Sequence, residues 1–175
     1  SIRVLKGIIL DGVRKANSGH SGGPLSSIDF AYILFSEYLN FDPGDPDWFG
    51  RDRFVLSAGH ESMLLYTLLS MIGWLSMDDL KQFRQFNSNT PGHPEVHIPG
   101  VEATTGPLGQ GVGMGVGMAV GEILYKNICA EKTGIDTSFL SHNTYILCSD
   151  GDLQEPVALG AASLAGHWQL RDITM

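Results

Sequence analysis

Charged residues are scarce in this chain, and positive charge is scarcer than negative charge. Of the 175 residues 17% are charged, with 11 Lys and Arg against 19 Asp and Glu, so the formal net charge is −8. Nucleic-acid binding needs a basic face against the phosphate backbone, so this balance argues against DNA or RNA as the main partner. The apolar stretch 108–120 is rich in glycine and shorter than the roughly 20 residues that span a bilayer, so we expect no membrane segment.

The chain contains only two cysteines, and no targeting signal is visible. Cys129 and Cys148 are not spaced as a metal pair or a CxxC redox motif, which fits free thiols in a reducing compartment. Residues 1–10 follow a helical apolar pattern interrupted by Arg3 and Lys6, without the apolar core and small-residue cleavage site of a secretory signal. The sequence therefore predicts a cytoplasmic protein.

The composition that remains is typical of one α/β domain. Hydrophobic residues make up 43% of the chain, which is enough for a buried sheet with covering helices. Apolar periodicity and turn residues predict the following order: helix 2–15, loop 16–24, helix 28–39 capped by Ser26 or Ser27, surface loop 41–52, strand 54–56, helix 61–72 ended by Gly73, helix 77–86 with Ser76 and Asp79 as a capping box, loop 87–105, a glycine-rich helix from 109, strand 144–148, a helix from Pro156 ended by Gly166, and the start of a strand within 170–175.

Glycines recur at helical spacing along the segment that begins at Gly109. One row contains Gly109, Gly113, Gly117 and Gly121, and a neighbouring row contains Gly111, Gly115 and Ala119. Each glycine costs a helix about 0.5–1 kcal/mol relative to alanine, so the rows need a packing reason. We expect close helix contact here, either between subunits or within the chain.

Three of the six histidines, His20, His60 and His93, directly follow a glycine in a predicted loop or turn. Near neutral pH an imidazole can donate to a diphosphate oxygen or transfer a proton. A purely structural role is the alternative for each one alone. Zinc binding is disfavoured because separations of 40 and 33 residues match no local ligand motif. The other three are assigned surface or core roles by default: His97, His142 and His167.

A carboxylate stands where a predicted strand gives way to a turn, at Asp150-Gly151. This oxygen ligand suits Mg²⁺ or Ca²⁺ bridging phosphate oxygens, although a lone Asp-Gly can be a plain turn. The glycine-rich run 106–111 lacks the Lys-Ser/Thr of a P-loop and the strand context of a dinucleotide fingerprint, so ATP and NAD are weakly supported. Glu155, just before Pro156, can act simply as a favourable charge at a helix start.

Four blocks, taken together, resemble transketolases in order and spacing. They are residues 16–20 (ANSGH), 52–60 (DRFVLSAGH), 90–95 (TPGHPE) and 104–111 (TTGPLGQG). The resemblance runs through essentially the whole chain, 1–175. It implies the family's N-terminal diphosphate-binding domain, a mostly parallel sheet flanked by helices, incomplete at its C-terminal end.

The resemblance implies a thiamine-diphosphate enzyme of the pentose phosphate pathway that moves a two-carbon ketol unit from a ketose phosphate to an aldose phosphate. His60, Gly106, Leu108 and Gly151 would bind the cofactor, and Asp150 would be a ligand of Mg²⁺ or Ca²⁺. The substrates would be sugar phosphates, and the full-length enzyme would be a homodimer.

The resemblance also assigns catalytic positions. His20 and His93 match residues that face the reacting end of the substrate. Glu155 matches a glutamate at the subunit interface that helps to position the activating carboxylate of the partner. The protein then supplies orientation and electrostatics while thiamine carries the carbon chemistry.

The chain departs from the family pattern at three positions. Ser21 replaces a common proline, Ser149 replaces the glycine before Asp150, and Asp152 brings a negative charge near the expected diphosphate. The asparagine pair that closes the family's metal motif is also absent, so we expect this chain alone to be inactive.

Two other functions are kept open besides a piece of a transketolase. One is an N-terminal subunit of a split enzyme, and the other is a non-catalytic domain that binds thiamine diphosphate or a protein partner. Among related enzymes, the block 90–95 favours transketolase over deoxyxylulose-phosphate synthase.

Overall fold

A three-stranded parallel sheet lies at the centre of the computed structural model, which describes all 175 residues. Its strands are β1 (Arg53–Leu56), β2 (Thr144–Leu147) and β3 (Ile173–Thr174), in the order β1-β2-β3. β1 and β2 pair in full register, from Arg53 opposite Thr144 to Leu56 opposite Leu147. The predicted α/β class with a parallel sheet flanked by helices is confirmed, as are the positions of both longer strands.

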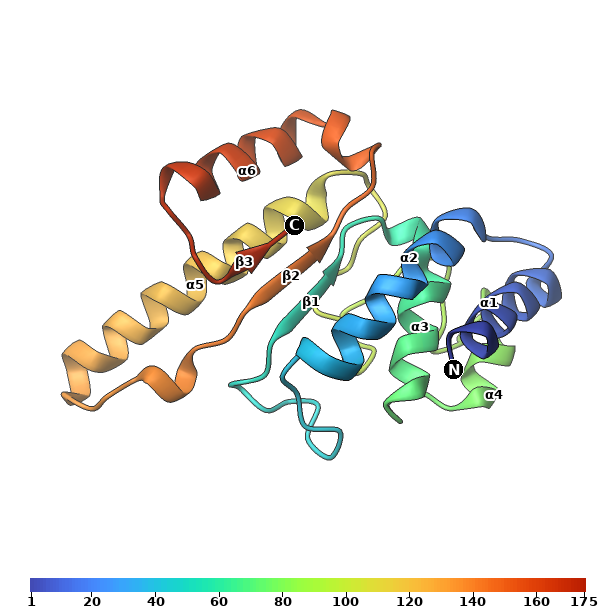
Figure 1. The fold of residues 1–175 in the computed structure, drawn as a ribbon, viewed down its shortest axis with the longest axis horizontal. Helices are drawn as coiled ribbons and strands as arrows, with labels where there is room; N and C mark the ends of the chain where they lie inside the picture. Colours follow the sequence, from blue (N-terminus) through green and yellow to red (C-terminus); the bar gives the residue numbers. More distant parts are fainter.

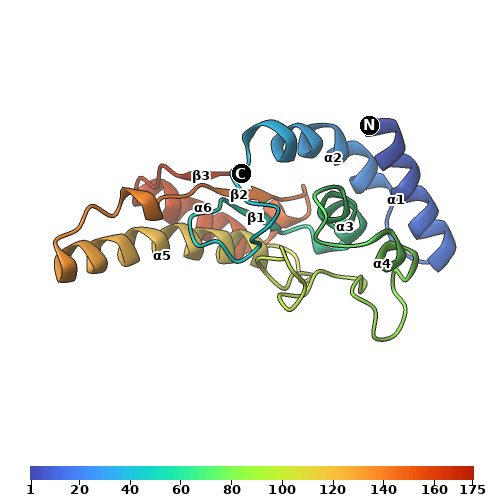
Figure 2. The same ribbon diagram turned by 90° about the horizontal axis from the view of Figure 1, so that it is seen from below.

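Helices cover both faces of this sheet. Figure 1 shows α5 and α6 on one side of the strands and α1 to α4 on the other, and in Figure 2 α2 and α5 lie on opposite faces. No helix combines the length and apolarity that a bilayer-spanning segment needs. The helices are α1 (Ile2–Ala16), α2 (Gly22–Ile33), the π-helix η1 (Leu34–Tyr38), the 3₁₀ turn η2 (Gly59–Glu61), α3 (Ser62–Met71), α4 (Met77–Lys81), α5 (Gln110–Thr133), the 3₁₀ turns η3 (Ser138–Leu140) and η4 (Asp152–Gln154), and α6 (Pro156–His167).

Alternate strand residues enter two separate cores, as the period of a strand requires. Phe54 and Leu56 belong to a cluster of 18 buried residues that is built mainly from α1, α2 and α3. Val55 and Ile146 point the other way, into a cluster of 5 buried residues that includes Val112 of α5. The long stretch between α4 and α5 has no regular element, as predicted.

Several predicted helix boundaries are wrong. α2 begins at Gly22, so the loop before it ends at Ser21, and Ser26 and Ser27 lie inside the helix instead of capping it. α4 does start at the predicted Ser76 capping box but ends at Lys81, well before residue 86. α6 continues past Gly166 to His167, since the left-handed residue that follows it is Gln169, at φ 54°.

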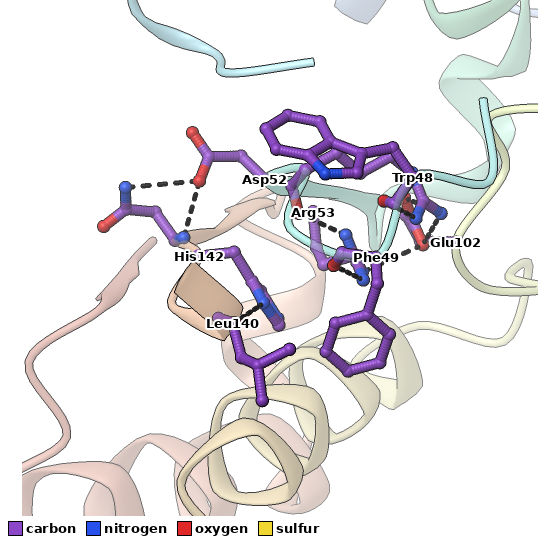
Figure 3. Close-up of polar contacts among 9 residues, drawn as sticks. Trp48, Phe49, Asp52, Arg53, Glu102, Leu140 and His142 are labelled. Atoms are coloured by element: carbon purple, nitrogen blue, oxygen red, sulfur yellow. Dashed lines mark hydrogen bonds and ion pairs between the residues drawn. The ribbon is translucent and has the colours of Figure 1, made fainter. Parts of the chain in front are cut away.

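A polar network holds the amino-terminal ends of β1 and β2 together (Figure 3). The carboxylate of Asp52 accepts hydrogen bonds from the backbone N–H groups of Asn143, at 2.6 Å, and Asn40, at 2.9 Å. Glu102 pairs with Arg51 at 3.0 Å and with Arg53 at 3.7 Å. Burial raises the pKa of Glu102, and the two arginines oppose that shift. These contacts set the register of the two strands.

Candidate functional site

The carboxyl ends of β1 and β2 lie side by side, and the segments that follow them meet the loop before α5. The hydroxyl of Thr105 donates to the carbonyl of Leu56 at 2.7 Å, which ties this loop to the end of β1. A Cβ on Gly59 would lie 2.6 Å from the backbone N of Gly106, so only glycine permits this approach. The predicted strand-to-helix turn at His60 therefore contacts the predicted glycine-rich loop directly.

Three loops bring the Gly-His dipeptides together at this edge. The rings of His20 and His60 stand edge to face with their centroids 5.1 Å apart. Gly106 adopts φ +150°, and a Cβ there would lie 3.2 Å from the ring of His93. The structure thus gathers His20, His60, His93 and Gly106, which are far apart in the sequence. His97 is exposed and pairs with Glu95 at 3.3 Å, in the same loop as His93.

Arg84 connects two of these histidine loops, and no sequence signal pointed to it. Its guanidinium donates to the hydroxyl of Ser18 at 2.7 Å, and its Nε is buried without a partner beside Gly92. The backbone of Arg84 is left-handed, at φ 60°. Partial burial is the largest of the effects that lower the pKa of His93. The positive charge of Arg84 and the nearby His60 and His20 lower this pKa further. This shift favours the neutral form of the His93 imidazole.

Glu61 is a second residue that the sequence did not single out. It directly follows His60, is only 6% exposed, and has a carboxylate oxygen without a hydrogen-bond partner. Burial raises its pKa, against the opposing effect of Ser27. The carboxyl group fills the space that a Cβ on Gly23 would need, at 2.5 Å from the Glu61 Cδ. A carboxyl group that binds protons more readily than usual thus lies beneath the start of α2.

The Asp150-Gly151 turn and Glu155 flank the other side of the glycine-rich loop. Gly151 packs against Leu108, and a Cβ on Gly151 would lie 3.3 Å from the Leu108 Cδ1. Gly109 packs against Glu155, and a Cβ on Gly109 would lie only 2.8 Å from the Glu155 Cβ. Asp150 is exposed at this edge. No group of three or more His, Cys, Asp or Glu side chains is arranged to hold a metal, so Asp150 would supply only part of a ligand set.

Asp152 does not direct its charge toward the edge of the sheet, contrary to the expectation from sequence. It is 0% exposed, and its carboxylate accepts hydrogen bonds from Ser57, Gly109 and Ser149. Burial alone would raise the pKa of Asp152, but these hydrogen bonds together lower it. The pattern Ser149-x-x-Asp152 is the signal that could have revealed this contact, because it matches a helix capping box.

The two glycine rows of α5 have different surroundings. Cβ atoms on Gly111 and Gly115 would collide with Ser57 and Ile146, so this row packs within the chain. The other row packs on the start of α6 at Gly109 and Gly113, but Gly117 and Gly121 have nothing within 4 Å of a Cβ, so only this second half of the row is open. An apolar cavity of about 370 Å³ lies away from the histidines, between Phe30 of α2 and the ends of β2 and β3.

The arrangement can bind a phosphorylated ligand that also requires proton transfer. It combines close backbone approach at Gly106, three imidazoles and an exposed carboxylate.

The chain matches the family described as "Transketolase, thiamine diphosphate binding domain" over residues 1–175. It is 54% identical over 172 residues to a transketolase of Geobacillus stearothermophilus, covering 97% of this chain and 25% of that protein. For a transketolase of Bacillus subtilis the identity is 49% over 173 residues, covering 97% and 25%.

Solved structures agree with the sequence comparison. A transketolase from Leishmania mexicana superposes with a TM-score of 0.89 at 44% identity, covering 99% of this chain and 26% of that one. One from Campylobacter jejuni gives a TM-score of 0.90 at 44% identity, covering 98% and 26%. The chain thus spans about a quarter of the length of the relatives it matches.

Proposed function

This chain belongs to the transketolase family, as its thiamine diphosphate binding domain, and from that premise we propose that residues 1–175 form the diphosphate-binding part of a ketol transferase. The complete enzyme would move a two-carbon ketol unit from a ketose phosphate to an aldose phosphate in the cytoplasm. The observation that carries the proposal is the meeting of His20, His60 and His93 with Gly106 at one edge of the sheet.

The residues at this edge fit thiamine diphosphate. Gly106 lets the backbone approach a ligand closely, and His60 beside it can donate to a phosphate oxygen. Gly151 and Leu108 lie against each other at the turn that follows β2. The exposed carboxylate of Asp150 is a hard oxygen donor for Mg²⁺ or Ca²⁺, and the diphosphate would supply further oxygens.

Bound thiamine diphosphate would supply the carbanion chemistry that breaks and forms the carbon–carbon bond. His20 and His93 would then orient the hydroxyl groups at the reacting end of the sugar phosphate and accept or return their protons. A neutral imidazole is needed for the accepting role, and the lowered pKa of His93 favours that form. Arg84 would keep the two histidine loops at a fixed separation through Ser18.

The cofactor assignment predicts a specific loss for Asp150→Asn. We expect this variant to bind thiamine diphosphate at least about tenfold more weakly in the presence of Mg²⁺, since a neutral amide is a poorer ligand for a hard cation. Calorimetric titration of the complete polypeptide measures this affinity, with the exposed Asp172→Asn as the control. Wild-type protein that binds no thiamine diphosphate would contradict the proposed function itself.

Glu155 and the open row of α5 support a homodimer. Glu155 is partly exposed beside Gly109, where a partner subunit could place a carboxylate against it. Gly117 and Gly121 form the half of the row that no segment of this chain covers within 4 Å of a Cβ. We propose that a second copy packs along this row, because several glycines in a helix need a packing reason.

Gly117→Leu is expected to shift the complete polypeptide from dimer to monomer. A leucine side chain would hold the second backbone away from α5, whereas Gly117→Ala adds only one methyl group and serves as the control. Sedimentation velocity measures the change. An unchanged sedimentation coefficient in Gly117→Leu would rule out this contact.

A non-catalytic binding domain is the second candidate, and a split enzyme is the third. A split enzyme and a non-catalytic domain that binds thiamine diphosphate both retain cofactor binding, so the calorimetric titration separates neither of them from a transferase; it separates only a domain that binds a protein partner instead. A ketol-transfer assay with sugar phosphates separates both, because a binding domain gives no turnover at saturating cofactor. A split enzyme gains turnover only when its second subunit is added.

A further inference from the structure

The Asp152 carboxylate joins the three segments that form the proposed cofactor site. Its Oδ1 accepts hydrogen bonds from the Ser57 hydroxyl at 2.8 Å and the Gly109 N–H at 2.7 Å. Its Oδ2 accepts from the N–H of Ser149 at 2.8 Å and from its hydroxyl at 2.9 Å. Ser57 follows β1, Gly109 precedes α5 and Ser149 follows β2. One buried carboxylate therefore fixes all three relative to one another.

Ser149 and Asp152 also close the turn between them. The hydroxyl of Ser149 accepts from the N–H of Asp152 at 3.2 Å, while the carboxylate accepts from the N–H of Ser149. This reciprocal pair has the bonding pattern of a capping box but closes the turn just before η4, and the two residues it encloses are Asp150 and Gly151. Ser149 and Asp152 were two separate departures from the family pattern, but in the structure each satisfies the other.

We propose that Asp152 is a positioning residue, which holds the Asp150-Gly151 turn against the loop before α5 so that the diphosphate and metal site is formed before the cofactor arrives. Asp152 itself does not contact the cofactor in this role. The inference rests on the proposed cofactor site and adds the residue that orders it. Preorganisation of this kind strengthens binding because the ordering cost is met during folding.

The role requires a carboxylate, not merely a side chain of this shape. An amide at position 152 has only one oxygen, so its NH₂ group must face either the N–H of Gly109 or the N–H of Ser149. The hydroxyls of Ser57 and Ser149 can rotate to accept a hydrogen bond, but a backbone N–H cannot. Asp152→Asn therefore breaks at least one of the two backbone contacts that hold the turn.

The test compares Asp152→Asn and Ser149→Ala with wild type in the complete polypeptide. Calorimetry measures the dissociation constant of thiamine diphosphate at saturating Mg²⁺, well below the unfolding temperature of each variant. We expect Asp152→Asn to bind about tenfold more weakly, the effect of losing one hydrogen bond to a buried charged group. Ser149→Ala should show a smaller loss. In a ketol-transfer assay, kcat at saturating cofactor should stay near the wild-type value.

Asp136→Asn is the matched control, because Asp136 makes the same pair of contacts elsewhere. Its carboxylate accepts from the N–H and hydroxyl of Ser138, in the exposed turn after α5. This variant should bind the cofactor as wild type does. Wild-type affinity in both folded test variants overturns the inference while leaving cofactor binding intact. If Asp152→Asn does not fold, Ser149→Ala decides: weaker binding supports the positioning role, and unchanged binding overturns it.

Discussion

Gly111→Ala is expected to lower the free energy of unfolding by about 3 kcal/mol, the upper end of the usual cost of overpacking. The added Cβ would overlap the Cα of Ser57 and lie 2.6 Å from its Cβ. The obstacle is backbone, so no side-chain rotation relieves it. α5 would have to move away from the end of β1, and the Ser57 contact with Asp152 would be disturbed as well. Urea unfolding followed by circular dichroism measures the change.

Gly121→Ala is the control for this substitution on the same helix. A Cβ on Gly121 meets nothing within 4 Å, so only helix propensity changes. We expect this variant to gain about 0.5–1 kcal/mol, because alanine is the better helix former. Equal stability changes in Gly111→Ala and Gly121→Ala would show that α5 does not pack on β1 as described.

His20→Ala and His93→Ala should each lower kcat/KM for ketol transfer by about 100-fold or more, the usual range for losing a proton-transfer group. Both rings lie in loops that Arg84 joins through Ser18 and Gly92, and neither supports the sheet. Stability should therefore change little. Steady-state assays on the complete polypeptide with sugar phosphates measure the loss.

His97→Ala is the matched control, since His97 lies four residues after His93 and contacts only Glu95 among charged groups. Its kcat/KM should remain close to the wild-type value. Calorimetry adds a second criterion: His20→Ala and His93→Ala should bind thiamine diphosphate normally, whereas His60→Ala should not. Near-normal ketol transfer by both His20→Ala and His93→Ala would refute the roles assigned to these two histidines.

The two longer strands could be predicted from sequence because their signals are local, whereas the grouping of the three histidine loops was implied only by the family resemblance. Short apolar runs mark β1 and β2, and Ser57 to Gly59 marks the turn after the first. Parallel strands end at the same edge of a sheet, so loops that follow them are brought together.

The start of α2 and the role of Asp152 could not be predicted, because both depend on tertiary contacts and not on a local sequence signal. Gly22-Gly23-Pro24 has low helix propensity, yet Pro24 and Ile28 are buried and the helix forms from Gly22 onward. Tertiary packing overrides propensity there. In the same way, the direction of the Asp152 side chain depends on Ser57 and Gly109, which are distant in sequence. Arg84 reaches Ser18 across 66 residues, a contact without any local pattern.

The parallel pairing of β1 with β2 determines the order in which this chain can fold during synthesis. Asp52 meets Asn143 across 91 residues, and Ser57 meets Asp152 across 95. α1, α2 and α3 pack on one another and are made long before β2, although their shared core also takes in Leu80, Phe83 and Ile98 from the stretch after α3. At about 5–20 residues per second, the ribosome takes roughly 5–20 s to deliver β2 after β1. Throughout that interval the β1 segment has no strand to pair with, and only the helices already made can cover its apolar side chains.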